Sequence, residues 1–192
     1  MQKLKHRIQT EGRNLGNGIL KIDSILNHQL DPQFMYEMGQ EMAKHFAHLK
    51  IDRILTVEIS GIAPALMTGL ALNVPVVYAR KIKPITMFGP VFLETAPSHT
   101  KGAEVNILVS AEFMKPDENV LIIDDFLATG KTLRALARII ESARAHVAGV
   151  GVVVEKPFEG GREYMVKHGY DVPIASLVQI ISMEDGQIVL AD

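Results

Sequence analysis

The sequence contains no cysteine among its 192 residues. This absence excludes disulfide bridges, thiolate zinc sites and cysteine nucleophiles. Long apolar runs are also missing, and none approaches the roughly 20 residues that a helix needs to span a bilayer. The formal net charge is only −2, so neither nucleic acid nor an anionic membrane is favoured as the main partner. The 47% content of hydrophobic residues is that of a globular protein with a substantial core.

Features of processed or multidomain chains are equally scarce. Residues 1–14 are basic and polar with no apolar stretch behind them, which is not the pattern of a secretory signal. Together with the lack of cysteine, this predicts a cytoplasmic location. There is no internal repeat, no low-complexity tract and no long linker, so residues 1–192 are predicted to form one domain.

Apolar runs of strand length alternate with segments of helical periodicity along most of the chain. Asp31 and Pro32 are typical of a helix start, with an acid at the N-cap and proline in the first turn. The alternation predicts an α/β fold with a mostly parallel central sheet flanked by helices. Residues 83–110, where prolines flank an apolar piece, predict a flexible arm or hairpin. The predicted helices cover residues 32–49, 62–72 and 161–167 and a segment after Gly130, and the predicted strands cover 53–58, 74–79, 105–109, 120–123, 147–154, 174–181 and 188–190.

Residues 120–132 carry the strongest functional signal. Four apolar residues predict a strand buried on both faces, and Asp124 and Asp125 follow where that strand is expected to end. Gly130 permits a tight turn, after which apolar residues at helical spacing begin a helix. Free N–H groups at this helix start, beside hydroxyls and a lysine, would bind phosphate, and the acids would bind hydroxyls, a metal or a developing positive charge. The predicted phosphate turn consists of Ala128, Thr129, Gly130, Lys131 and Thr132.

Two families use a Gly-Lys-Thr turn of this kind. A nucleotide-binding P-loop requires a glycine five residues before the Gly-Lys pair, where this chain has Asp125, whose charge would repel phosphate. A solvated acidic turn is the plain alternative, and it leaves the phosphate-binding residues unexplained. At every position the segment resembles the phosphoribosyl-diphosphate motif of the type I phosphoribosyltransferases, an apolar strand followed by two acids and a Thr-Gly turn.

Two further loops are expected at the same edge of the sheet, where ligands gather in such folds. Residues 58–64 form a small-residue turn before a helix, so N–H groups near Ser60 and Gly61 could hold a second anion. Alone this pattern is weak, but phosphoribosyl diphosphate carries phosphates at both ends. Arg80 and Lys81 follow the next strand and could neutralise a diphosphate, although a solvated basic turn is equally compatible. In the type I enzymes a basic residue at this place often contacts the diphosphate.

Lys156 ends the strand that follows the long helix, and this strand should open into the same cleft. A surface lysine is the ordinary explanation of such a residue. In a cleft, however, its ammonium could donate to a carbonyl oxygen while Phe158 stacks on a flat ring. Such a donor favours a 6-oxopurine over adenine, because the amine of adenine would leave the lysine unpaired.

The resemblance extends to residues 20–32, which read Leu-Lys-Ile-Asp-Ser-x-Leu-Asn-His-Gln-x-Asp-Pro. Together with Ser-Gly-Ile-Ala-Pro-Ala and Val-Pro-Val-Val-Tyr-Ala-Arg-Lys, this stretch looks like bacterial members of the family that act on xanthine. The likeness covers almost the whole chain. It implies the type I fold with a small hood, formed by about residues 1–30 and the C-terminal segment. It also implies that Leu20 and Asn27 in the hood, and Lys156 on the sheet, contact the base.

The resemblance implies transfer of a phosphoribosyl group from 5-phospho-α-D-ribose 1-diphosphate to xanthine, giving xanthosine 5'-monophosphate and diphosphate in purine salvage. Asp124 and Asp125 would stabilise positive charge on the ribose. Mg²⁺ would be carried by the diphosphate, and no direct side-chain ligation of a metal is expected. His45 and His48, three apart on a helix, are more simply a surface pair. A homodimer is also implied.

Two alternatives stay open. One is an enzyme of the same family that acts on guanine or hypoxanthine; xanthine needs one more donor than hypoxanthine, which the amide of Asn27 could supply. The other is a non-catalytic regulator that binds phosphoribosyl diphosphate. Such regulators add a DNA-binding domain, and the roughly 30 residues before the first long predicted helix are too few for one.

Overall fold

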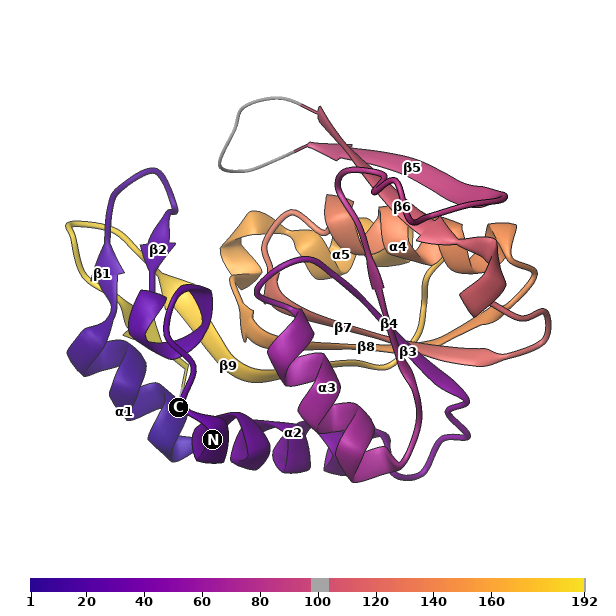
Figure 1. The fold of residues 1–192 in the computed structure, drawn as a ribbon. Helices are drawn as coiled ribbons and strands as arrows, with labels where there is room; N and C mark the ends of the chain where they lie inside the picture. Colours follow the sequence, from indigo (N-terminus) through magenta and orange to yellow (C-terminus); the bar gives the residue numbers. More distant parts are fainter. Residues whose placement is uncertain (98–103, 192) are drawn as a thin grey trace.

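A six-stranded sheet forms the centre of the computed structural model, which describes residues 1–97 and 104–191 (Figure 1). The strand order is β10-β9-β8-β7-β3-β4, and all neighbours run parallel except β10, which is antiparallel to β9. The mostly parallel α/β sheet expected from the sequence is confirmed. The strands span Arg53–Val57 (β3), Val76–Ala79 (β4), Asn119–Leu127 (β7), His146–Glu155 (β8), Ile174–Ser182 (β9) and Val189–Leu190 (β10).

Helices cover both faces of this sheet. One face carries α2 (Pro32–Phe46) and α3 (Ile62–Leu72), and the other carries α4 (Lys131–Ser142) and α5 (Gly161–Lys167) (Figure 1). The apolar residues of β7 therefore alternate between two cores. Ile122 packs in the core with α4, whereas Leu121 and Ile123 pack in the core with α2. This double burial explains why every position from Val120 to Ile123 is apolar.

Most predicted elements are confirmed within a few residues. Asp31 caps α2 by accepting a hydrogen bond from the Phe34 N–H at 3.1 Å. The largest difference is at β7, which does not end before the acids but continues through them to Leu127. This occurs because β8 pairs along the whole segment, with Asp124 opposite Val152. Among the described residues, no helix is both long and apolar enough to cross a membrane.

The N-terminal helix α1 (Gln2–Glu11) was not predicted by the sequence pattern. Only Leu4 and Ile8 among its residues are buried, one helical turn apart, while the other residues are exposed or only partly buried. Two apolar positions in ten give only a narrow hydrophobic stripe, so the segment shows no helical periodicity in the sequence and has the composition of a polar N-terminus.

The chain then forms the short strands β1 (Arg13–Asn14) and β2 (Leu20–Lys21) and a π-helical turn over Asp23–Asn27. This region is attached to the end of the chain: the Asn14 side chain donates to the Met183 carbonyl at 2.7 Å, and Lys5 donates to the Ala191 carbonyl at 2.8 Å. Residues 1–30 and 183–191 are called the hood below.

Strands β5 (Val91–Pro97) and β6 (Glu104–Ser110) form an antiparallel hairpin, which confirms the hairpin expected within residues 83–110. A bridge between Arg80 and Leu108 joins it to the edge of the main sheet. Residues 98–103, which connect the two strands, lie outside the described residues. We expect this arm to close over a bound substrate and exclude water, and this expectation stays a prediction.

Candidate active site

A cleft of about 530 Å³ lies where the carboxyl ends of β3, β7 and β8 meet the hood. Its walls come from five parts of the chain that are distant in sequence: the hood, the loop after β3, the loop after β4, the end of β7 with the turn into α4, and the turn after β8. The ends of β5 and β6 close one side. The residues discussed below that line it are Gly18, Leu20, Asn27, Glu58, Ser60, Lys81, Asp124, Asp125, Phe126, Ala128, Thr129, Gly130, Lys131, Thr132, Lys156 and Glu159.

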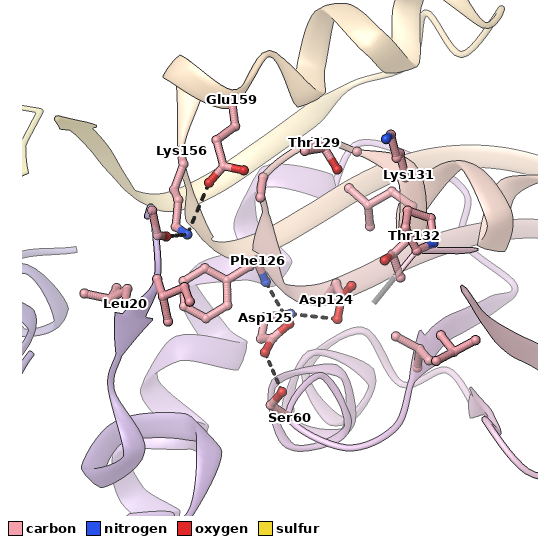
Figure 2. A pocket seen from close by; sticks show the side chains of 18 of the residues that line it. Leu20, Ser60, Asp124, Asp125, Phe126, Thr129, Lys131, Thr132, Lys156 and Glu159 are labelled. Atoms are coloured by element: carbon pink, nitrogen blue, oxygen red, sulfur yellow. Dashed lines mark hydrogen bonds and ion pairs between the residues drawn. The ribbon is translucent and has the colours of Figure 1, made fainter. Parts of the chain in front are cut away.

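The two adjacent acids lie at the floor of the cleft (Figure 2). Asp124 is only 4% exposed, and its Oδ1 accepts a hydrogen bond from the Asp125 N–H at 2.9 Å. Burial raises the pKa of Asp124 well above its usual range, and the neighbouring Asp125 carboxylate raises it further. Asp125 accepts a hydrogen bond from the Ser60 hydroxyl, which ties the end of β7 to the loop after β3.

The five residues of the predicted phosphate turn all line the cleft and lead directly into α4. Gly130 precedes the first residue of the helix with a φ of 76°, in the left-handed region that favours glycine. A Cβ at this position would also lie 2.7 Å from the carbonyl oxygen of Gly161. The turn thus requires glycine for two reasons, and it directs the N-terminal N–H groups of a 12-residue helix into the cleft.

The loop after β3 supplies the opposite wall. Ser60 lines the cleft, whereas Gly61 lies behind the wall, where a Cβ would approach Asp124 Oδ1 to 2.7 Å. Of the two cations expected here, Lys81 lines the cleft and Arg80 does not. Arg80 is instead paired with Glu58 at 2.7 Å, and Glu58 also accepts a hydrogen bond from the Lys81 N–H at 2.6 Å.

Lys156 lies at the hood end of the cleft and is only 7% exposed. Its ammonium donates to the carbonyl of Gly18 in the hood, lies 3.3 Å from a carboxylate oxygen of Glu159 and is 5.4 Å from the centre of the Phe126 ring (Figure 2). Leu20 also faces this space in Figure 2. Asn27, at the end of the π-helical turn, lines the same part of the cleft.

Phe158, which the sequence suggested as a stacking residue, lies outside the cleft and is 48% exposed. The reason is the 3₁₀ turn over Pro157–Glu159, whose three residues per turn bring Lys156 and Glu159 to one side and direct Phe158 away. The aromatic residue in the cleft is Phe126, next to the acid pair. Phe126 lies within the motif of residues 120–132, so the sequence could have indicated it. It was missed because β7 was expected to end before the acids.

A buried ionic network supports the Lys156 turn from below. Glu155 is 2% exposed and accepts two hydrogen bonds from Arg162, at 3.0 and 2.7 Å. Ser176 and Gln179 on β9 donate to the same carboxylate, at 2.8 and 2.9 Å. Burial acts to raise the pKa of Glu155, but the hydrogen bonds from Arg162, Gln179 and Ser176 outweigh it and hold that pKa below its usual range. The network fixes the end of β8 against α5 and β9.

Among the residues that the structure describes, the cleft offers carboxylate oxygens as ligands but no complete metal cage. Asp124, Asp125 and Glu58 line it, and carboxylate oxygens suit a hard cation such as Mg²⁺. Within residues 1–97 and 104–191, no group of three or more His, Cys, Asp or Glu side chains is placed to hold a metal ion. A cation that enters on a phosphorylated ligand would find carboxylates here and take its remaining ligands from the ligand itself and from water.

Comparison with known proteins agrees with this arrangement. The family model described as "Phosphoribosyl transferase domain" matches residues 25–182. The chain is 47% identical to the xanthine phosphoribosyltransferase of Deinococcus deserti over 186 residues, covering 97% of this chain and 95% of that protein. It is 46% identical to the xanthine phosphoribosyltransferase of Listeria monocytogenes over 192 residues, covering 100% of this chain and 99% of that protein.

Solved structures show the same fold. The adenine phosphoribosyltransferase of Thermoanaerobacter pseudethanolicus superposes with a TM-score of 0.73 at 21% identity, covering 92% of this chain and 99% of that chain. The adenine phosphoribosyltransferase of Rhodothermus marinus gives a TM-score of 0.73 at 24% identity, covering 93% and 97%. At these identities the likeness concerns the fold alone.

Proposed function

Because the chain belongs to the phosphoribosyltransferase family, we propose that it transfers the phosphoribosyl group of 5-phospho-α-D-ribose 1-diphosphate to xanthine. The products are xanthosine 5'-monophosphate and diphosphate, and the reaction serves purine salvage. The choice of xanthine is supported by 46–47% identity, over nearly the full length, to proteins named xanthine phosphoribosyltransferase. The observation that carries the proposal is that the turn into α4, the acid pair and Lys156 open into one cleft.

The phosphate groups of the donor bind at two helix starts. The 5-phosphate lies on the turn formed by residues 128–132, where the first N–H groups of α4 and the Lys131 and Thr132 side chains provide donors. The diphosphate lies against Ser60 and Lys81 on the opposite wall, with the Gly61 backbone behind it. Arg80 contributes by holding Glu58, because it forms an ion pair with that carboxylate rather than lining the cleft.

The acid pair acts on the ribose between these two ends. Asp124 and Asp125 accept hydrogen bonds from the ribose hydroxyls and stabilise the positive charge that develops on the ring as the bond to diphosphate breaks. Ser60 orients Asp125 through its hydrogen bond. The reaction then needs no covalent nucleophile, because most of the rate comes from positioning and charge.

Asp124 and Asp125 at the floor of the cleft would hold a Mg²⁺ ion carried by the donor, directly or through water. The ion would supply positive charge to neutralise the leaving diphosphate. The support for this assignment is the chemistry of the oxygen donors at that floor.

The base binds at the hood end of the cleft. Lys156 donates to its 6-carbonyl, the Asn27 amide donates to the 2-carbonyl, and Leu20 and Phe126 contact the faces of the ring. Because Lys156 is nearly buried, a base that cannot accept its hydrogen bond leaves one N–H of the ammonium without a partner, which disfavours adenine.

We also propose that the enzyme is a homodimer that works in the cytoplasm. Support for the dimer comes from apolar side chains at the β4 edge of the sheet, where Phe88 is 83% exposed and Phe113 is 52% exposed. Support for the location is chemical: a donor with so many phosphate charges does not cross membranes unaided. No nucleic acid or membrane partner is proposed.

Parallel assays with xanthine, hypoxanthine, guanine and adenine, each with phosphoribosyl diphosphate and Mg²⁺, test this function. A marked preference in kcat/KM for xanthine is expected. Preference for another oxopurine would retain the mechanism and overturn the base. Absence of product from every base, with the donor still bound, would indicate a non-catalytic regulator instead.

A further inference from the structure

Glu159 lines the cleft beside Lys156, although it was not among the site residues expected from the sequence. Its side chain is 21% exposed, and one carboxylate oxygen lies 3.3 Å from the Lys156 ammonium. The hood partly covers it from above, since a Cβ added to Gly18 would lie 3.4 Å from Glu159 Oε1. The carboxylate thus lies beside Lys156 at the hood end of the cleft, where a bound base would contact it (Figure 2).

The local backbone fixes this arrangement. Pro157 occupies the first position of the 3₁₀ turn, and the Glu159 N–H donates to the Lys156 carbonyl at 3.0 Å. With three residues per turn, Lys156 and Glu159 necessarily share a side. The network below, in which Arg162 binds Glu155, prevents the end of β8 from shifting. The separation of the ammonium and the carboxylate is therefore set before any ligand binds.

Hydrogen-bonding capacity remains on both groups. The ammonium has three donors, of which the Gly18 carbonyl and Glu159 take two. The Glu159 carboxylate has about four acceptor positions. The cleft therefore presents a free donor and a free acceptor side by side, next to the Phe126 ring. A ligand matches this pair if it carries an acceptor and a donor on adjacent atoms of a flat ring, in that order.

We propose that Glu159 is a specificity-determining residue that accepts the N–H at position 1 of the base while Lys156 donates to the neighbouring 6-carbonyl. The inference rests on the proposed function and assigns a second residue to base recognition. The pair then reads the O=C–N–H edge shared by xanthine, hypoxanthine and guanine. Adenine carries the reverse order, an amine at position 6 and a lone pair at position 1, so both contacts would be mismatched.

Methylated bases distinguish a role of Glu159 in base recognition from a purely structural role, because each methyl group replaces the hydrogen of one N–H of the ring. Xanthine, 1-methylxanthine and 3-methylxanthine are assayed with the wild type and with Glu159→Ala, Glu159→Gln and Glu163→Ala. Glu163 is an exposed residue of α5 outside the cleft lining, so its variant is a matched control. Melting curves of all four proteins establish that each is folded.

Glu159→Ala is expected to raise KM for xanthine about 10- to 100-fold, with KM for phosphoribosyl diphosphate unchanged. The penalty of 1-methylxanthine relative to xanthine, expected in the wild type, should disappear in Glu159→Ala, while the penalty of 3-methylxanthine stays. Glu159→Gln should recover part of the loss, since its carbonyl oxygen can accept the N–H. Glu163→Ala should match the wild type.

Three outcomes would overturn the inference. An unchanged ratio between 1-methylxanthine and xanthine in Glu159→Ala would mean that Glu159 only positions Lys156. Loss of the 3-methylxanthine penalty in Glu159→Ala would place the carboxylate at the N–H of position 3 instead of position 1. An unaltered KM for xanthine would remove Glu159 from recognition. If the wild type itself does not use xanthine, the proposed function fails first, and that result is separate from these.

Discussion

Asp124 is a carboxylate buried beside a second carboxylate, and this placement affects both stability and function. Burial and the charge of Asp125 raise the pKa of Asp124, so the folded state binds its proton more tightly than the unfolded chain does. The free energy of unfolding therefore decreases as the pH rises from about 4, the pKa of an unfolded aspartate, through the higher folded value. The raised pKa of Asp124 therefore makes the protein less stable at neutral pH than at about pH 4, as is common for residues retained for activity.

Asp124→Asn is accordingly expected to separate stability from activity. The amide removes the buried charge but keeps an oxygen to accept the Asp125 N–H, so the melting temperature at pH 7 should rise, by about 2–4 °C for each kcal/mol gained. The gain should shrink toward pH 4, where Asp124 is protonated in the wild type. Turnover should fall about 10²- to 10³-fold, because the ribose loses a charged acceptor.

Thermal melts at pH 4 and pH 7, with Asp185→Asn as an exposed control, test the stability part of this prediction. A melting temperature that does not rise at pH 7 would show that a compensating contact relieves the buried charge. Near-normal turnover would remove Asp124 from the mechanism. The two readouts are independent, so one can fail without the other.

For individual residues, the sequence predicted the parts of the site that are formed by residues close together in the chain. The acids and the phosphate turn are contiguous, and they reach the cleft together. That Lys81 rather than Arg80 lines the cleft, and Phe126 rather than the expected Phe158, depends instead on which side of the backbone each residue faces. That orientation follows from a 3₁₀ turn and from strand pairing, which residue types alone did not determine.

The turn between β7 and α4 depends on glycine at residue 130, and its substitution tests the element as a whole. Gly130→Ala would place a Cβ 2.7 Å from the Gly161 carbonyl, in addition to the strain of a φ of 76°. The clash would displace the start of α4 or of α5. We expect a destabilisation of more than about 2 kcal/mol and a raised KM for phosphoribosyl diphosphate.

Gly186→Ala is the matched control, because Gly186 has the same φ of 76° with no atom within 4 Å of the added Cβ. In urea denaturation, Gly186→Ala should lose only the free energy of unfolding that corresponds to backbone strain, about 1–2 kcal/mol. Its kinetic constants should equal those of the wild type. Equal destabilisation of the two variants would show that the approach to Gly161 imposes no constraint on the turn.

The contact between α5, β8 and β9 depends on Arg162, which pairs with the buried Glu155. Hydrogen bonds hold the pKa of Glu155 below its usual range, so the stability they contribute is present above about pH 4.3, the unfolded value, and is lost as the pH falls through the folded value. Arg162→Ala should destabilise the protein by about 2 kcal/mol at pH 7.

Urea denaturation of Arg162→Ala and the wild type at pH 7 and pH 3 measures this effect. The difference should be smaller at pH 3, because protonation of Glu155 as the pH falls removes the charge that Arg162 pairs with. Arg138→Ala, which removes an exposed ion pair with Glu94, should change stability much less than Arg162→Ala does. A pH-independent loss for Arg162→Ala would assign its role to packing rather than to charge.

The sequence predicted a helix such as α4, whose apolar residues recur on every turn. It did not predict α1, which has too few apolar residues to show a helical period. Helix α4 has buried residues on every turn, whereas α1 has only Leu4 and Ile8. α1 is stabilised by contacts with distant parts of the chain, for example by the hydrogen bond from the N-terminal amine to the Leu177 carbonyl on β9 at 3.2 Å. Partners 176 residues apart leave no local pattern in the sequence.

On the scale of the whole molecule, the apolar groove at the β4 edge of the sheet remains uncovered within one chain. It is lined by Tyr78, Phe88 and Phe113 among others, and has a volume of about 410 Å³. An edge strand beside exposed aromatic residues favours association, because water contact with these side chains is unfavourable. The proposed homodimer would cover this groove with its second copy.

Phe88→Asp is therefore expected to shift the protein from dimer to monomer, because a buried interface cannot readily accept an unpaired carboxylate. Val166→Asp is the control, since Val166 is 48% exposed on α5, away from the groove. Sedimentation velocity at several concentrations, together with a melting curve, distinguishes dissociation from unfolding. A wild type that remains monomeric at high concentration would overturn the dimer, and a Phe88→Asp variant that remains dimeric would place the interface elsewhere. Loss of turnover on dissociation would further mean that the loop carrying Lys81, seven residues before Phe88, depends on the second copy for its position in the cleft.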